Sequence, residues 1–225
     1  MSLRIDIVTL FPDIFFGPLK SSIVGRAIRQ QQVEINAIDL RDYTHDERKT
    51  VDDKPFGGGP GMLMKIEPLF EAVSSLKQTG TKVILTGPSG ERFTQKVARR
   101  LSGESHIIFI CGHYEGVDQR VRDCLIDMEL SIGDYVLTSG NLAAMVMTDA
   151  IVRLLPGVLG DEKSAEDESF EDSLLEYPQY THPVDFHGMR VPEILLSGDH
   201  AKIKAWRHAE SVNKTLLVRP DLLEK

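Results

Sequence analysis

Short apolar runs alternate with helical patterns over the first two thirds of the chain, and this alternation restricts the possible folds more than any other feature. Four runs with few polar interruptions are typical of β-strands, namely LRIDIVTL (3–10), VEINAID (33–39), KVILT (82–86) and HIIFIC (106–111). A fifth strand is expected within 128–137. Between the runs, apolar residues recur at helical spacing, at Ile23, Ala27 and Ile28 and again at Leu69, Val73 and Leu76. Strand followed by helix, repeated, predicts an α/β fold with a parallel sheet flanked by helices.

The chain is predicted to divide into three parts. Pro156 and Gly157 end the last helical pattern of the first half, NLAAMVMTDAIVRLL, which places the first domain at residues 1–157. Residues 161–176 carry eight acids and one lysine, so this one segment holds nearly all of the net charge of −8. Its polarity predicts a flexible acidic interdomain linker over 158–192. A small helical domain with a local basic face is expected at 193–225.

Composition excludes several classes of protein. No apolar run is long enough to cross a bilayer, and the start of the chain lacks the features of a signal peptide, so we expect a cytoplasmic protein. Cys111 and Cys124 are the two cysteines and stand far apart, which indicates neither a disulfide framework nor a thiolate cluster. The seven histidines are scattered without ligand spacing, and we expect no structural metal.

Three glycine-rich segments follow predicted strands: TGPSG (86–90), CGHYEG (111–116) and SIGDYVLTSGN (131–141). Ligands of parallel α/β sheets bind beyond the carboxyl ends of the strands, and glycines there let a flat ligand reach peptide groups directly. Each segment taken alone is equally well explained as a tight turn. Three of them at one sheet edge favour a binding site for a nucleotide-like ligand.

That ligand is not predicted to be a dinucleotide or a nucleoside triphosphate. The Gly-x-Gly-x-x-Gly fingerprint and the Gly-Lys-Ser/Thr ending of a phosphate loop are both absent from the sequence. The GGGPG run at 57–61 does not replace them, because the DDKPF stretch before it does not have the pattern of a strand.

Charged residues near the glycine-rich segments have structural explanations as well as functional ones. Arg153 lies near the end of a predicted helix. Arginines there commonly interact favourably with the helix dipole or extend toward solvent. Glu115 in the YEG turn is as consistent with a carboxylate that stabilises the loop as with a site residue. Asp167 and Glu168 belong to an acidic run, and such carboxylates are usually only solvated.

Several motifs in order resemble one family closely: THDERKTVDDKPFGGGPGMLM, CGHYEG, SIGDYVLTSG, RLLPGVLG and SAEDESF. The chain resembles the bacterial tRNA (guanine-N1)-methyltransferases, the TrmD family of the SPOUT superfamily. The similarity extends from IVTLFP (7–12) to RPDLL (219–223) and so covers essentially the whole chain.

The resemblance implies an activity and an assembly. The family transfers a methyl group from S-adenosylmethionine to N1 of the guanine 3′ of the tRNA anticodon, so the anticodon arm is the expected partner. The family fold implies a trefoil knot in the parallel sheet domain, which would then bind S-adenosylmethionine, and a C-terminal helical domain that binds tRNA. It also implies a homodimer in which the cofactor loops of one subunit and the linker and C-terminal domain of the other form each active site.

Site residues are carried over from the matching motifs. The resemblance implies that Glu168 removes the guanine N1 proton and that Arg153 and Glu115 lie near the guanine. It implies contacts to the cofactor from Thr86, Pro88, Gly112, Ser131, Ile132, Gly133, Asp134, Tyr135, Val136, Leu137 and Gly140. No tightly bound metal is expected.

Some residues depart from the family pattern. His113 stands where arginine is usual, Asn141 and Ala143 replace a glutamate and a proline, and Glu168 replaces an aspartate. Asp167 beside Glu168 leaves the base open between the two, with Glu168 preferred. Two alternatives follow from these departures: a non-catalytic RNA-binding protein with a SPOUT fold, or a SPOUT methyltransferase of another RNA.

The glycine-rich stretch DDKPFGGGPGM (52–62) has no cofactor fingerprint. The resemblance implies a loop near the active site that recognises the anticodon arm, with Asp52, Lys54 and the glycines as candidates for contact with nucleotides.

Overall fold

The fold is given by a computed structural model that describes residues 2–159, 169–170 and 173–224. The chain forms two compact units, Met1–Gly160 and Asp161–Lys225. The division falls just after residue 157, where the first domain is predicted to end. The assignment of a flexible linker to 158–192 and of tRNA binding to 193–225 stays a prediction.

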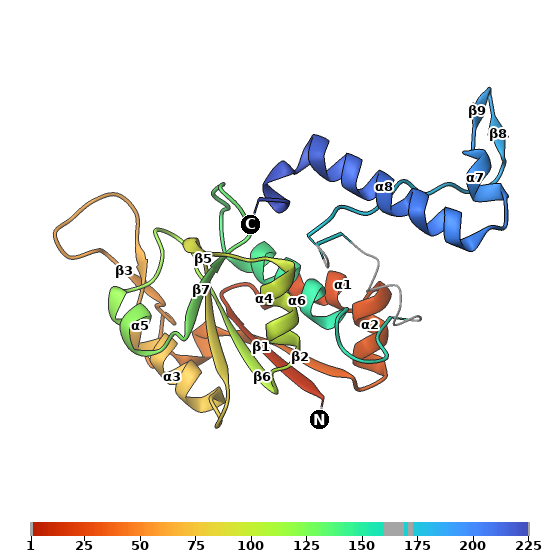
Figure 1. Ribbon diagram of the computed structural model, residues 1–225. Coiled ribbons are helices and arrows are strands. Elements are labelled where there is room, and N and C mark those ends of the chain that lie inside the picture. The colour runs from red at the N-terminus through yellow and green to blue at the C-terminus, as the bar shows by residue number, and fades with distance from the viewer. Residues whose placement is uncertain (1, 160–168, 171–172, 225) are drawn as a thin grey trace. The chain divides into compact units, whose positions relative to one another are not determined.

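The first unit is built on a five-stranded sheet of order β2-β1-β6-β5-β7 (Figure 1). All neighbours in it pair in parallel. The strands are β1 (Leu3–Thr9), β2 (Val33–Asp39), β5 (Lys82–Arg92), β6 (His106–Cys111) and β7 (Met128–Ser131). The predicted parallel sheet is therefore confirmed, with the fifth strand at the start of the expected range. The knot stays a prediction, because strand order and register do not define one.

Helices cover both faces of this sheet, because successive side chains of its buried strands point to opposite sides. Ile107 and Phe109 of β6 pack into the core on one face, and Ile108 and Ile110 into the core on the other. The first core is covered by α2 (Ser22–Arg29), α4 (Gln95–Ser102) and α6 (Asn141–Val152). The second is covered by α3 (Ile66–Leu76) and α5 (Gln119–Cys124). The fold class predicted from the alternation of strands and helices is thus confirmed.

Short elements complete the first unit. The chain after β1 forms η1 (Pro12–Phe15) and α1 (Phe16–Leu19), and the chain after β2 forms η2 (Leu40–Tyr43). A two-stranded antiparallel pair, β3 (Asp52–Asp53) and β4 (Leu63–Met64), encloses the glycine-rich stretch as a loop.

The second unit is dominated by the long helix α8 (His200–Val218), which the Asp199 carboxylate caps by accepting from the Lys202 amide. Buried Thr215 on α8 accepts a hydrogen bond from the Leu175 amide at 2.8 Å, which ties an extended segment to the helix. The other elements are the hairpin β8 (Asp185–Phe186) and β9 (Met189–Arg190), with α7 (Glu193–Leu196) and η4 (Pro220–Leu222). No helix in the described part of the chain is long and apolar enough to cross a membrane.

A buried carboxylate joins three segments inside the sheet domain. Asp6 of β1 is fully buried and accepts hydrogen bonds from Arg4 and from the Asn36 amide of β2. Its other oxygen lies 2.9 Å from the His106 ring of β6, whose second nitrogen lies 2.8 Å from the Thr81 hydroxyl. Because its partners lie on β1, β2 and β6, the carboxylate links three neighbouring strands of the sheet.

We predict that Asp6→Ala lowers the free energy of unfolding by about 2–4 kcal/mol, because it leaves buried donors without an acceptor. Urea denaturation measures the change. The exposed Asp13 of η1 supplies the control, and Asp13→Ala should stay within about 0.5 kcal/mol of the parent. Equal losses in both variants would contradict the structural role of Asp6.

Candidate active site

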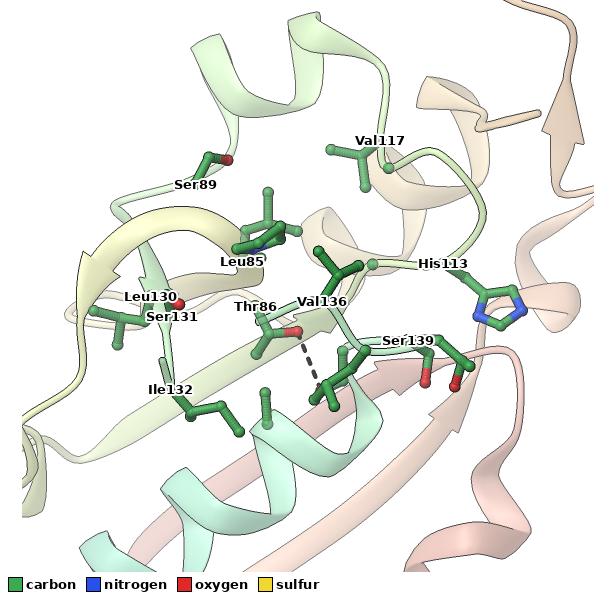
Figure 2. A pocket seen from close by; sticks show the side chains of 18 of the residues that line it. Leu85, Thr86, Ser89, His113, Val117, Leu130, Ser131, Ile132, Val136 and Ser139 are labelled. Carbon is green, nitrogen blue, oxygen red and sulfur yellow. Dashed lines mark hydrogen bonds between the residues drawn. The ribbon is translucent and has the colours of Figure 1, made fainter. Parts of the chain in front are cut away.

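The carboxyl-terminal edge of the sheet holds a cavity of about 320 Å³ (Figure 2). Its walls come from β5, from the segment after β6 and from the segment after β7. The pairing of β5 with β7 is interrupted between Thr86 and Glu91, so the glycine-rich part of β5 bends away at the cavity. Figure 2 shows Thr86, Ser131, Ile132 and Val136 around this space.

The three segments meet at Gly140. Its amide donates to the Gly112 carbonyl at 2.7 Å, and the Thr86 hydroxyl lies 3.3 Å from the Gly140 carbonyl and 3.2 Å from that of Ile110. A Cβ at position 140 would overlap Thr86 Oγ1 and come within 2.9 Å of the Gly112 nitrogen. Glycine is therefore required here for space, because backbone from one segment touches backbone from the others.

The Glu129 side chain holds the outer wall of the cavity in place through two contacts. Glu129 of β7 accepts a 2.7 Å hydrogen bond from the Ser89 hydroxyl and forms an ion pair with Arg122 of α5. A Cβ at Gly87 would collide with the same carboxylate. Glu129 and Arg122 were not predicted as site residues. The sequence gives only a weak indication of this pair, namely a carboxylate in the strand directly before SIGDYVL.

Most residues predicted to contact the cofactor line this one cavity. They are Thr86, Pro88, Gly112, Ser131, Ile132, Gly133, Tyr135, Val136, Leu137 and Gly140. Asp134, in the same segment, is exposed and is not among the lining residues. Their individual contacts with a ligand stay predictions.

Glu115 also lines the cavity and connects it to the glycine-rich loop. Its amide donates to the Met62 carbonyl at 3.0 Å, and the Met64 amide donates to the Gly116 carbonyl at 2.9 Å. Gly61 has φ of +79° and a Cβ there would overlap the Glu115 side chain. The loop of residues 54–62 is therefore attached to the cavity rim, a contact that the residues alone did not reveal.

Arg153 lies away from this cavity within the same chain. It is the C-cap of α6, whereas Gly140 at the N-cap touches the cavity wall. The helix has 12 residues and spans about 18 Å at 1.5 Å per residue. Arg153 is not among the lining residues. Glu168 and Asp167 lie outside the described residues.

Almost the whole chain is similar to one family of known proteins. Residues 3–225 match the family described as tRNA (Guanine-1)-methyltransferase TrmD. A tRNA (guanine-N(1)-)-methyltransferase of Dictyoglomus turgidum is 59% identical over 223 residues, which cover 99% of this chain and 91% of the relative. Proteins of the same name from Carboxydothermus hydrogenoformans and Staphylococcus carnosus are each 54% identical, covering 99% of this chain and 88% and 91% of theirs.

The chain belongs to the TrmD family. The resemblance inferred from the motifs is confirmed, and with it the class of the chain, which is a methyltransferase enzyme. A methyltransferase requires a methyl donor. Residues of two of the motifs, CGHYEG and SIGDYVLTSG, line the glycine-rich cavity.

The structure shows the contacts of two residues that depart from the TrmD pattern. His113 lines the cavity, and its ring packs edge-on against Phe11 and Tyr114, with centroids 5.3 and 4.7 Å away. Asn141 is buried at the start of α6, where its side-chain oxygen accepts a 2.8 Å hydrogen bond from the Thr9 hydroxyl. Each departure therefore has packing or hydrogen-bond partners within the fold.

The Cys111 thiol, next to Gly112 of the cavity wall, is buried. Burial raises the pKa of the Cys111 thiol far above its ordinary range, which the nearby Thr86 hydroxyl offsets only in part. The thiol therefore stays protonated and takes no part as a nucleophile. Beyond the rim, a hydrogen bond from Arg120 lowers the pKa of Asp118. Among the described residues no group of His, Cys, Asp and Glu gathers as a candidate metal site.

We predict that Gly140→Ala separates the three segments and lowers the free energy of unfolding by about 1–3 kcal/mol, the usual cost of overpacking. Hydrogen exchange should be faster at the amide of residue 140, which has lost its acceptor. Gly103→Ala is the matched control, since a Cβ there would meet only ordinary contact at 3.5 Å. Unchanged exchange in the Gly140 variant would contradict the proposed crowding.

Proposed function

We propose that the chain transfers a methyl group from S-adenosylmethionine to N1 of the guanine 3′ of the tRNA anticodon, in the cytoplasm. The observation that carries the proposal is the TrmD match over residues 3–225, combined with the convergence of its glycine motifs on one cavity. The binding partner is the anticodon arm, where unpaired bases can leave the stack and enter a pocket at modest cost.

The cavity fits the proposed methyl donor. Its volume of about 320 Å³ lies at the lower end of the range of roughly 300–1,000 Å³ for small-molecule sites. Gly112, Gly133 and Gly140 line its wall without side chains, so a flat group such as an adenine ring can come close to the backbone there. S-adenosylmethionine would supply a methyl carbon bonded to a positively charged sulfur.

Proton removal is the step that the protein must catalyse. Guanine N1 carries a proton, so a base has to accept that proton as N1 bonds to the methyl carbon. The carbon–sulfur bond breaks, and its electron pair stays on the sulfur, which becomes neutral. We assign the base to Glu168, which lies outside the described residues.

Two further residues would contact the guanine. Negative charge develops on guanine O6 as the proton leaves, and the Arg153 guanidinium would stabilise it with fixed donors. Glu115 at the cavity wall would accept a hydrogen bond from the guanine edge. The backbone amide of Glu115 donates a hydrogen bond to the Met62 carbonyl, and this bond holds the backbone that carries the carboxylate in place.

We also propose a homodimer with shared active sites. Arg153 and the cavity lie at opposite ends of α6 in one chain, so a second copy is the natural source of the guanidinium. Leu142 and Val146 lie four residues apart on α6 and are both half exposed, which provides an apolar surface for that copy. Isologous pairing would complete two equivalent sites at once.

The test of the activity is methylation of paired RNA substrates. We expect methyl incorporation into a tRNA with guanine 3′ of the anticodon and none when adenine replaces it. Primer extension should stop at the modified base, because a methyl group at N1 blocks the Watson–Crick edge. Methylation at another position would instead support a different RNA target, and no incorporation into either substrate would support a non-catalytic RNA-binding protein.

The shared site predicts recovery of activity in mixed dimers. Glu115→Ala alters the cavity side and Glu168→Gln the linker side, so each variant alone should be inactive. Subunit exchange of equal amounts should restore about a quarter of the wild-type rate, because half of the dimers are mixed and each holds one intact site. Sites confined to one subunit would stay inactive after mixing, and that result would refute the shared arrangement.

The base assignment is checked with the same variants. Asp167→Asn serves as the matched control for Glu168→Gln, and it should keep methyl transfer if Glu168 is the base. Loss of activity in Asp167→Asn with normal activity in Glu168→Gln would reassign the base to Asp167.

A further inference from the structure

Phe56 is the most exposed large apolar side chain among the described residues. It lies in the loop of residues 54–62 between β3 and β4 and is 101% exposed, so none of the described residues covers it. In Figure 1 this loop, in orange beside the label β3, extends well beyond the sheet. Single exposed apolar residues are common, so exposure alone assigns no role.

The conformation of the loop is what makes Phe56 distinctive. The next three residues, Gly57, Gly58 and Gly59, all have positive φ, at +85°, +79° and +128°. A Cβ at any of the three would meet nothing within 4 Å. Glycine is needed here for its backbone geometry and not for packing, so the loop is shaped to extend away from the domain.

The base of the same loop is attached to the candidate active site. Asp53 pairs with Leu63 in the short antiparallel ladder, and the Met62 carbonyl accepts from the Glu115 amide at the cavity rim. Met62 is six positions after Phe56 in the chain, so the two residues lie at most roughly 20 Å apart. If one part of a large ligand occupies the cavity, an adjacent part of the same ligand could therefore contact the Phe56 ring.

We propose that Phe56 is a stacking platform for an unpaired nucleobase that lies next to the methylated guanine in the tRNA anticodon loop. The inference rests on the proposed function and extends it to a second contact outside the cavity. Every nucleobase has a flat apolar face, and single-stranded nucleic acids are commonly held by stacking on exposed aromatic side chains. The bare glycine backbone beside the ring permits close approach by the ribose–phosphate chain.

A single-tryptophan protein provides a direct test. Trp206 is the sole tryptophan of the chain, so the double variant Phe56→Trp, Trp206→Phe places the only indole at the loop. We expect its emission to be quenched on titration with an anticodon stem-loop RNA. An abasic site at one loop position next to the guanine should abolish the quenching, whereas abasic sites in the stem should not. Quenching that no abasic site changes, or no quenching, would overturn the inference.

Truncation of the ring measures its contribution. Phe56→Ala should raise the dissociation constant for the same RNA about 5- to 150-fold, while Phe56→Tyr should retain the wild-type value. Phe70→Ala is the matched control, because this ring on α3 is also exposed but lies on a helix whose other side packs into the core. We expect no change in the control.

Phe56 could be covered by RNA or by a second copy of the chain. Sedimentation velocity of the same variants without RNA distinguishes the two partners. We expect the sedimentation coefficient of Phe56→Ala to equal that of the wild type. A shift to smaller species, or RNA binding equal to wild type, would overturn the inference. These binding measurements need no methyl transfer, so a wild-type chain without methylation activity would refute the proposed function while leaving the stacking result readable on its own.

Discussion

The contact of Gly140 with Thr86 and Gly112 is the constraint on which the rest of the candidate site depends. It joins the segment after β7 to the middle of β5 and to the segment after β6, and it requires a residue without a side chain. The cavity exists because the remaining parts of these three segments diverge from this point. The site is therefore a product of backbone proximity, with side chains such as Glu129 and Ser89 fixing the outer wall.

The same contact sets the direction of α6. The helix begins at the cavity and continues into the core, where Ala144, Met147 and Ile151 are fully buried. Its other end, with Arg153, is thereby held about 15 Å along the helix from Ala143, which lines the cavity. A residue that the family motif assigns to the guanine is thus kept away from the cavity of its own chain. The proposed dimer resolves this conflict without any movement of the helix.

Much of the fold followed from local patterns, and the rest depended on contacts between distant segments. The run HIIFIC was predictable as a strand because all six residues are buried. The helix α4 was missed because it has only eight residues and two arginines separate its buried Val97 and Ala98 from Leu101. The convergence of the glycine segments on one edge was also predictable, since the carboxyl ends of parallel strands share an edge. The pairing of Glu129 with Arg122 and the fit of Gly61 against Glu115 were not, since no local periodicity records which segments meet.

The central claim is that peptide groups of the three segments hold the methyl donor. Backbone amide NMR spectra, recorded with and without S-adenosylmethionine, test it most directly. The account predicts that the amide resonances of Gly112, Ile132, Leu137 and Gly140 shift together on addition of the donor, while those of α3 on the far side of the sheet do not. Shifts that fall elsewhere, with these four amides unchanged, would contradict the account.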